Sequence, residues 1–240
     1  MIKYLLLLVV TSYSMINAEL IPEASIRIPL SSDLALKTKE NELGKPSVKS
    51  GEFIYQDLAE GRKGLVRGTV DTSLMYRSLL SLDKTGSIVF WIKFLFNPKE
   101  DAFTHNFISL RPAAGGYIGL YKSVGSSEIN FGMRTTTEAS FQVLPLKLSI
   151  QAEDIFHIVL NWKEGGLESY VNGELSNTVE GVRYSPPACV GWTDIYIGEI
   201  YHASLKEGNL SEKEDMVIGD VQIFPKNLNA EEVNALMNSK

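Results

Sequence analysis

The chain has 240 residues, 44% of them hydrophobic, and its 23 Lys and Arg against 29 Asp and Glu give a net charge of −6 at pH 7. This moderately acidic balance, without runs of Lys or Arg, disfavours binding to nucleic acid or to anionic membranes through bulk charge. A single cysteine, Cys189, excludes an internal disulfide, so the packed core must stabilise the fold.

The first 18 residues have the pattern of a secretory signal. Lys3 supplies a positive charge, residues 4–10 form an apolar run, and Ala18 is a small residue before a cleavage point. The run is too short to cross a bilayer, which takes about 20 residues. We therefore expect a signal peptide over residues 1–18 and one domain over residues 19–240, secreted to the extracellular space or periplasm, with no transmembrane segment after signal removal. The alternative is an uncleaved N-terminal anchor.

Short apolar alternations separated by Gly, Pro, Asn and Ser predict an all-β chain up to about residue 229. Residues 26–30 are expected as an edge strand, residues 31–50 as a loop, and residues 52–55 and 64–68 as short strands. The strongest strand signal covers residues 87–96, which are apolar on both faces. Such a strand lies in the middle of stacked layers, and Trp91 is therefore interpreted as a core residue.

The middle of the chain predicts antiparallel strands at intervals of about ten residues, as in two packed sheets. These strands are expected at residues 106–110, 116–122, 128–133 and 139–144. The segment between Arg111 and Tyr117 is interpreted as a flexible turn, because no helix follows its glycines to form a phosphate site.

The second half predicts a hairpin, further strands and a final helix. Residues 156–162 form an apolar strand ending at Trp162, and Asn172-Gly173 is a two-residue hairpin turn. His157 in this strand is interpreted as a structural histidine. A strand follows at residues 194–198. A closing strand at residues 217–224 is expected to place Val217, Val221 and Ile223 on one face. Asn229, with Glu232 three residues later, predicts a capped helix.

Three segments in this order resemble the laminin-G-like group of the concanavalin A-like lectin/glucanase superfamily. Residues 86–93 resemble its first central strand, residues 156–173 its hairpin, and residues 219–233 its closing strand and helix. The resemblance covers residues 25–238. It implies an all-β, two-sheet antiparallel jelly-roll sandwich with a short C-terminal helix. Members are often exported, and many bind glycans, cell-surface or matrix partners, or Ca²⁺.

No cofactor is expected, and the case for Ca²⁺ is weak. The closing strand of the family often has two consecutive acidic residues, whereas this chain has Gly219 followed by Asp220. Calcium prefers six to eight oxygen ligands, and no dense Asp/Asn loop supplies them. Asp220 is the one weak candidate for a metal ligand.

A cluster of aromatic and polar residues near position 190 is the candidate ligand site. Sugars are bound by aromatic faces with polar groups placed around them. The candidate ligand-binding residues are Tyr184, Trp192, Asp194, Tyr201 and His202. Tyr196 lies in the same stretch, where it alternates with Ile195 and Ile197.

No catalytic motif is present in the sequence. The paired-carboxylate string of β-glucanases, the Gly-x-Ser-x-Gly elbow and the His-Glu-x-x-His motif are absent. We therefore predict a secreted non-catalytic binding module for a glycan or for an extracellular or cell-surface partner. One alternative is a protein-interaction or surface-structural module without sugar affinity. A third alternative is a polysaccharide hydrolase or lyase, which two carboxyl groups facing each other in a cleft would favour.

Overall fold

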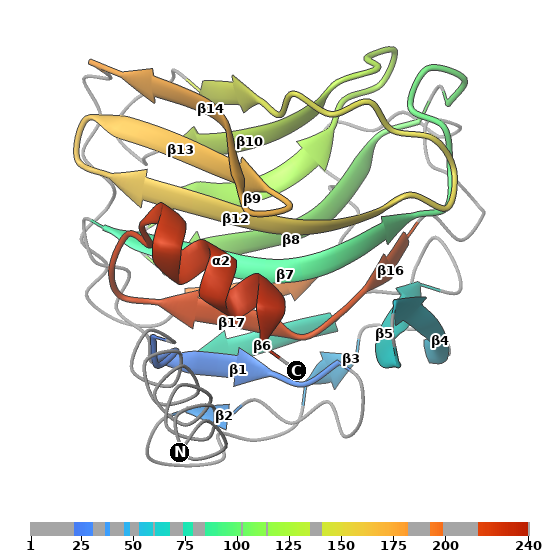
Figure 1. Ribbon diagram of the computed structural model, residues 1–240, viewed down its shortest axis with the longest axis horizontal. Coiled ribbons are helices and arrows are strands. Elements are labelled where there is room, and N and C mark those ends of the chain that lie inside the picture. Colours follow the sequence, from blue (N-terminus) through green and yellow to red (C-terminus); the bar gives the residue numbers. More distant parts are fainter. Residues whose placement is uncertain are drawn as a thin grey trace, which may run out of the picture.

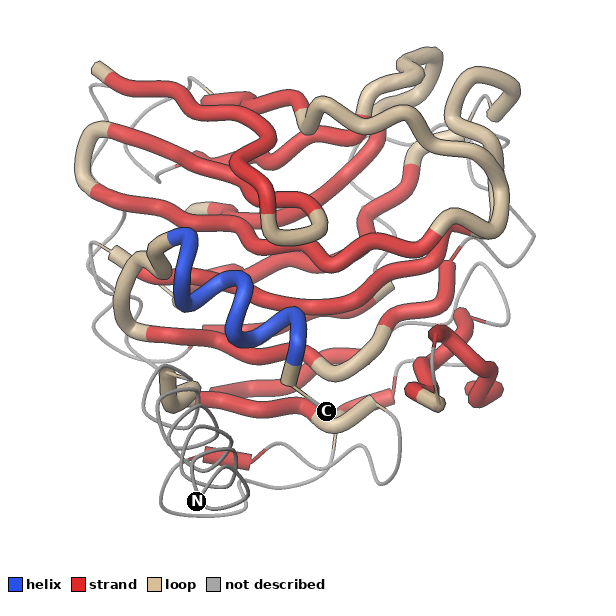
Figure 2. The backbone as a smooth tube through the Cα atoms, in the orientation of Figure 1, coloured by secondary structure: helices blue, strands red, loops and turns tan. Residues whose placement is uncertain are grey.

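The computed structural model describes residues 22–30, 37–38, 46–48, 53–59, 61–67, 74–78, 85–101, 103–113, 115–134, 141–181, 193–198 and 216–239. Within these residues, two antiparallel sheets lie face to face and one helix covers part of the outer side of the larger sheet (Figures 1 and 2). The expected fold class, a two-sheet jelly-roll sandwich with a short C-terminal helix, is confirmed. No helix in this part of the chain is long and apolar enough to cross a membrane.

The larger sheet is built around the strand that is apolar on both faces, β7 (Gly86–Phe94). This strand pairs with β12 on one side and with β16 and β17 on the other. The other strands of this sheet are β1 Ile26–Ile28, β2 Lys37–Thr38, β4 Phe53–Ala59, β5 Arg62–Arg67, β12 Ile155–Lys163, β13 Gly166–Val171, β14 Glu174–Glu180, β16 Met216–Ile218 and β17 Val221–Phe224.

The smaller sheet has the strand order β11-β10-β9-β8-β15-β6-β3. Its strands are β3 Ser47–Val48, β6 Leu74–Ser78, β8 His105–Pro112, β9 Tyr117–Lys122, β10 Ile129–Arg134, β11 Gln142–Pro145 and β15 Thr193–Ile197. The run from β8 to β11 is the predicted meander. The expected loop at residues 31–50 contains β2 and β3, which are too short to show a sequence alternation.

The main core fills the space between the sheets and contains Phe90, Phe94, Phe107, Phe131 and Trp162, each almost fully buried. A second apolar cluster lies outside the larger sheet, beneath helix α2 (Ala230–Asn238). Val233 and Leu236 of the helix pack there on Val89 of β7. This second layer explains why β7 is apolar on both faces.

Two local signals in the second half of the chain, the hairpin turn and the helix cap, are confirmed. Asn172 and Gly173 both have positive φ, as a two-residue hairpin turn between β13 and β14 requires. The Asn229 side chain accepts a hydrogen bond from the backbone N–H of Glu232, and the Glu232 carboxylate accepts one from the backbone N–H of Asn229. These two reciprocal bonds form the predicted capping box.

The closing strand differs from its prediction because it is broken by a bulge. Ile218 pairs with Ile92 and Gln222 pairs with Val89, so four steps along the closing strands match three along β7. The extra residue inverts the alternation. Ile218 and Val221 therefore both face the main core, whereas Val217 faces outward, contrary to the expected shared face of Val217, Val221 and Ile223.

Trp91 is also placed differently from its prediction. Its ring lies on the outer face of the larger sheet and is half-buried, packed at the edge of a small cluster with Leu58, Val66 and Val217. Helix α2 covers the neighbouring Val89 but leaves Trp91 beside a cavity, so Trp91 is not a main-core residue.

Candidate functional site on the outer face of the smaller sheet

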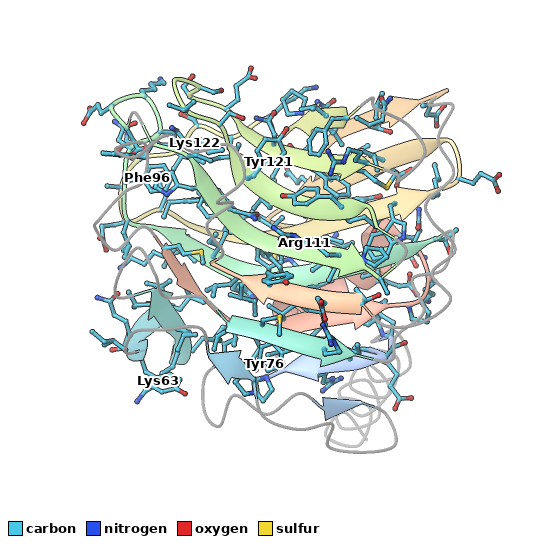
Figure 3. All side chains as sticks on the ribbon, turned by 180° about the vertical axis from the view of Figure 1, so that it is seen from behind. Lys63, Tyr76, Phe96, Arg111, Tyr121 and Lys122 are labelled. Carbon is cyan, nitrogen blue, oxygen red and sulfur yellow. The ribbon has the colours of Figure 1, made fainter. Side chains whose placement is uncertain are left out.

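The outer face of the smaller sheet is rich in aromatic and charged side chains. Strand alternation sends Leu110 and Ile195 into the core, and thereby sends their neighbours Arg111, Asp194 and Tyr196 outward. Figure 3 views the molecule from this side and shows Arg111 and Tyr121 over the sheet. The side chains from β6, β8, β9, β10 and β15 therefore form one surface.

Asp194 lies at the centre of a charged group on this surface. It pairs in register with Arg77 of β6 on one side and with Arg111 of β8 on the other. The Arg77 guanidinium donates two hydrogen bonds to the Asp194 carboxylate, Nε to Oδ1 at 2.8 Å and Nη2 to Oδ2 at 3.1 Å. The Arg111 guanidinium carbon lies 4.4 Å from the centroid of the Tyr196 ring. This bidentate pair and the cation–π contact hold planar groups in defined orientations.

An aromatic cluster lies beside the charged group. The ring centroids of Tyr117 and Tyr121 each lie 5.5 Å from that of Phe141. Gly132 makes this packing possible, because a Cβ there would lie 2.5 Å from the Phe141 ring and 2.6 Å from the Tyr121 ring. Phe141 is 38% exposed, so part of the cluster faces solvent.

Hydrogen-bonding groups accompany the rings. Burial raises the pKa of Tyr121 to about 12, so its phenol stays protonated at neutral pH. The Tyr117 hydroxyl donates to Asn106 Oδ1 at 3.2 Å. Ser109 Oγ and Asn130 Oδ1 are buried and have no hydrogen-bond partner among the described residues. The surface therefore combines aromatic rings with polar atoms that can orient hydroxyl groups.

Of the candidate ligand-binding residues, the structure places Asp194 on this surface. Tyr184, Trp192, Tyr201 and His202 lie outside the described residues, as do Cys189 and the expected signal peptide. Sequence reasoning missed Arg111, because the segment that it begins was interpreted as a turn, and it placed Tyr117 in the expected strand at residues 116–122 without identifying it as a site residue. Arg111 in fact belongs to β8, whereas Tyr117 begins β9 close to the expected bound. The available signal was the alternation of Leu110 with Arg111 and of Ile118 with Tyr117.

Asp220, the weak metal candidate, is far from Asp194 in the fold because it follows β16 of the larger sheet. It lines a cavity together with Arg27, Arg62 and Lys63. Among the described residues, no group of three His, Cys, Asp or Glu side chains is placed to hold a metal ion. The positive charges around Asp220 do not fit a calcium site.

The sequence from residue 68 to residue 234 matches the concanavalin A-like lectin/glucanase superfamily. The match covers more than half of the chain, so this protein belongs to that superfamily. No curated protein matches the sequence.

Solved structures share the fold at low sequence identity. One is domain 4 of AbnA, an extracellular GH43 arabinanase from Geobacillus stearothermophilus, in complex with arabinotriose. It has a TM-score of 0.68 and 13% identity, over 90% of this chain and 98% of that one. A second is the receptor binding domain of the botulinum neurotoxin C/D mosaic serotype, with a TM-score of 0.66 and 16% identity over 89% of this chain.

A third is the ligand binding domain of botulinum neurotoxin serotype D in complex with N-acetylneuraminic acid, with a TM-score of 0.62, 16% identity and coverage of 89% of this chain. This chain spans about half of each of the two toxin domains, 50% in both comparisons. These likenesses show the fold.

Proposed function

We propose that this protein is an exported, non-catalytic binding module that recognises a glycan through the outer face of the smaller sheet. The observation that carries the proposal is the surface formed by Tyr117, Tyr121 and Phe141 next to the Arg111–Tyr196 contact. Aromatic rings supply contact area to the apolar face of a sugar at low entropic cost, and fixed polar groups orient its hydroxyls. The fold relatives include a domain solved with arabinotriose and one solved with N-acetylneuraminic acid, which supports this choice.

The state of Asp194 supports binding without turnover. Glycoside hydrolysis uses two carboxyl groups, one of which transfers a proton. Asp194 is the one carboxylate in the seven described strands of this sheet, and Arg77 donates hydrogen bonds to both of its oxygens. A carboxylate held by two hydrogen bonds from one guanidinium orients that guanidinium, which suits recognition.

The first test is glycan-array binding with residues 19–240, followed by calorimetry on any glycan that binds. We expect Phe141→Ala and Arg111→Met each to weaken binding about tenfold, the effect of losing a central aromatic or arginine contact. Leu175→Ala is the matched control, because Leu175 is an exposed apolar residue, 56% accessible, on β14 of the other sheet. Binding that neither site variant alters would show that this face is not the site.

Trp192 directly precedes Thr193, the first residue of β15, and we propose that it belongs to the same site together with Tyr184, Tyr201 and His202. Trp192→Ala is expected to weaken the same glycan about tenfold. Calorimetry under matched conditions measures the effect. An unchanged dissociation constant would remove Trp192 from the site and leave the face defined by Phe141 and Arg111.

A protein partner is the second candidate. Phe141 and Val143 are 38% and 42% exposed at the β11 end of the face, which also suits an apolar protein contact. Binding of a cell-surface protein after enzymatic removal of its glycans, lost in Phe141→Ala, would favour this role. An absence of binding to any glycan would contradict the leading proposal.

A further inference from the structure

A cavity of about 630 Å³ lies on the opposite side of the molecule, on the outer face of the larger sheet. It is bounded by the β4–β5 hairpin, by the C-terminal end of α2 and by the central strands. Its lining includes Arg62, Trp91, His157, Asp220 and Gln222. Ligand sites commonly have volumes of about 300–1,000 Å³.

The bulge in the closing strand forms one wall of this cavity. The Gly219 backbone N–H donates to the Trp91 carbonyl at 2.8 Å, which continues the pairing through the bulge. A Cβ at position 219 would come within 2.9 Å of Leu58 and 3.2 Å of the Trp91 Cβ. Glycine therefore allows the backbone to approach β7 at this point, and Asp220 follows at the rim. Bulges of this kind are frequent beside functional sites.

Arg62 is held in position before any ligand binds. Its guanidinium carbon lies 5.0 Å from the centroid of the Trp91 ring, and its Nη2 donates to the Ser239 carbonyl at 2.5 Å. The two contacts come from different elements, the central strand and the residue after the helix. A guanidinium fixed in this way loses little entropy when it binds an anion through its remaining donors.

Two buried polar atoms in the same cavity have no hydrogen-bond partner among the described residues. They are His157 Nδ1, on a side chain that is only 1% exposed, and Gln222 Oε1. Burying a polar atom without a partner costs about 1–3 kcal/mol, so such atoms call for an explanation. A ligand that offers both donors and acceptors would satisfy them.

The charges in the cavity identify the class of ligand. Arg27, Arg62 and Lys63 supply three positive charges, and Asp220 supplies one negative charge. Burial, together with the charge of Arg62, lowers the pKa of His157 to about 4, so its imidazole is neutral at physiological pH and can pair with a hydroxyl group. An anion without hydroxyl groups would leave His157 and Gln222 unpaired, and a neutral sugar would not use the cations.

We propose that this cavity is a second binding site that takes one acidic sugar unit, with its carboxylate on Arg62 and its hydroxyl groups on His157 and Gln222. The site is separate from the glycan face of the smaller sheet and does not depend on it. The rim cations Arg27 and Lys63 attract the anion, and Asp220 is an acceptor for a further hydroxyl.

The test uses glucuronate, with glucose and acetate as the two partial mimics. Binding is followed by the indole N–H signal of Trp91 in ¹H–¹⁵N spectra. That signal is one of three tryptophan signals and is identified by its loss in Trp91→Phe. We expect glucuronate to shift it and to bind at least tenfold more tightly than glucose or acetate. Arg62→Gln should weaken glucuronate about tenfold or more, as expected for the loss of a charge-assisted hydrogen bond.

Two controls separate this site from its alternatives. Lys99→Gln removes the same charge from an exposed position outside the cavity and should leave glucuronate binding unchanged. Phe141→Ala should also leave it unchanged, even if the glycan face of the smaller sheet is confirmed. His157→Gln provides a second variant if Arg62→Gln does not fold, and should reduce the preference for glucuronate over acetate. Equal binding of acetate, an equal loss in Lys99→Gln, or no shift of the Trp91 signal would each overturn the proposal.

Discussion

Replacing Lys122 by methionine is expected to lower the free energy of unfolding by about 3–5 kcal/mol, the usual cost of removing one partner from a buried ion pair. The Lys122 side chain is fully buried, and its Nζ lies 2.9 Å from Asp101 Oδ2. It also donates to the backbone carbonyls of Asp101 and Phe103, both at 2.9 Å. Methionine would leave all three acceptors without these bonds.

His105 is the third member of this group. Its Nε2 lies 2.8 Å from the same Asp101 oxygen, and its ring stacks on Phe96 with centroids 4.2 Å apart. Burial acts to raise the pKa of Asp101, but the hydrogen bonds and charges of His105 and Lys122 more than offset it and hold the pKa below its usual value. The stability that this carboxylate contributes is therefore present at neutral pH and is lost as the pH falls through its depressed folded-state pKa.

Denaturant unfolding of Lys122→Met against the wild type measures the effect. Lys99→Met is the matched control, because Lys99 is exposed in the loop between β7 and β8 that contains Asp101, and it should change stability by no more than about 0.5 kcal/mol. The double variant Asp101→Asn/Lys122→Met should lose less than the sum of the two single losses. Equal stability of Lys122→Met and Lys99→Met would show that the pair does not hold the loop.

Acidification is expected to destabilise the protein through His157 by about 3 kcal/mol once the pH has fallen from 7 to about 4. The folded-state pKa of His157 is about 4, mainly because of burial and secondly because of Arg62, against an ordinary value of 6.5. Between these values the unfolded chain takes up a proton that the folded chain refuses, so the stability present above pH 6.5 is progressively lost.

His157→Gln isolates this contribution, because glutamine does not titrate. The difference in unfolding free energy between the wild type and this variant should change by about 3 kcal/mol over that pH range, as measured by denaturant titrations at several pH values. The other charged groups around the cavity are present in both the wild type and the variant, so the comparison isolates the titration of His157. These groups are Arg27, Arg62, Lys63 and Asp220. A difference that is independent of pH would show that His157 titrates normally in the folded state.

The fold was predictable from local patterns that tertiary structure preserves. Three features depend only on residues that are neighbours in the sequence, and each appears as predicted: the apolar strand β7, the Asn172-Gly173 turn and the helix cap at Asn229. The bulge after Ile218 was not predictable, because one extra residue shows only against the register of a partner strand. β6 was also missed, although Leu74 and Tyr76 alternate with Met75 and Arg77 as in an ordinary half-buried strand.

The candidate sites were harder to predict because residues distant in the sequence form them. Asp194 was identified from its aromatic neighbours in the chain, yet its structural partners Arg77 and Arg111 come from other strands. His157 and Trp91 were interpreted as structural because they lie in apolar strands. Only their cross-strand pairing, with Arg62 over the indole, shows that they share a cavity.

The order of the strands in the larger sheet has a consequence for biosynthesis. β16 and β17, at residues 216–224, stand between β7 and the earliest strands, and Ile26 of β1 pairs with Ile223 of β17. A nascent chain therefore cannot close this sheet until its last strands have left the ribosome, and until then β1 and β5 lack their partners β17 and β16. Late closure of the sheet would keep the chain unfolded for longer during synthesis, which suits the export that we propose for this protein.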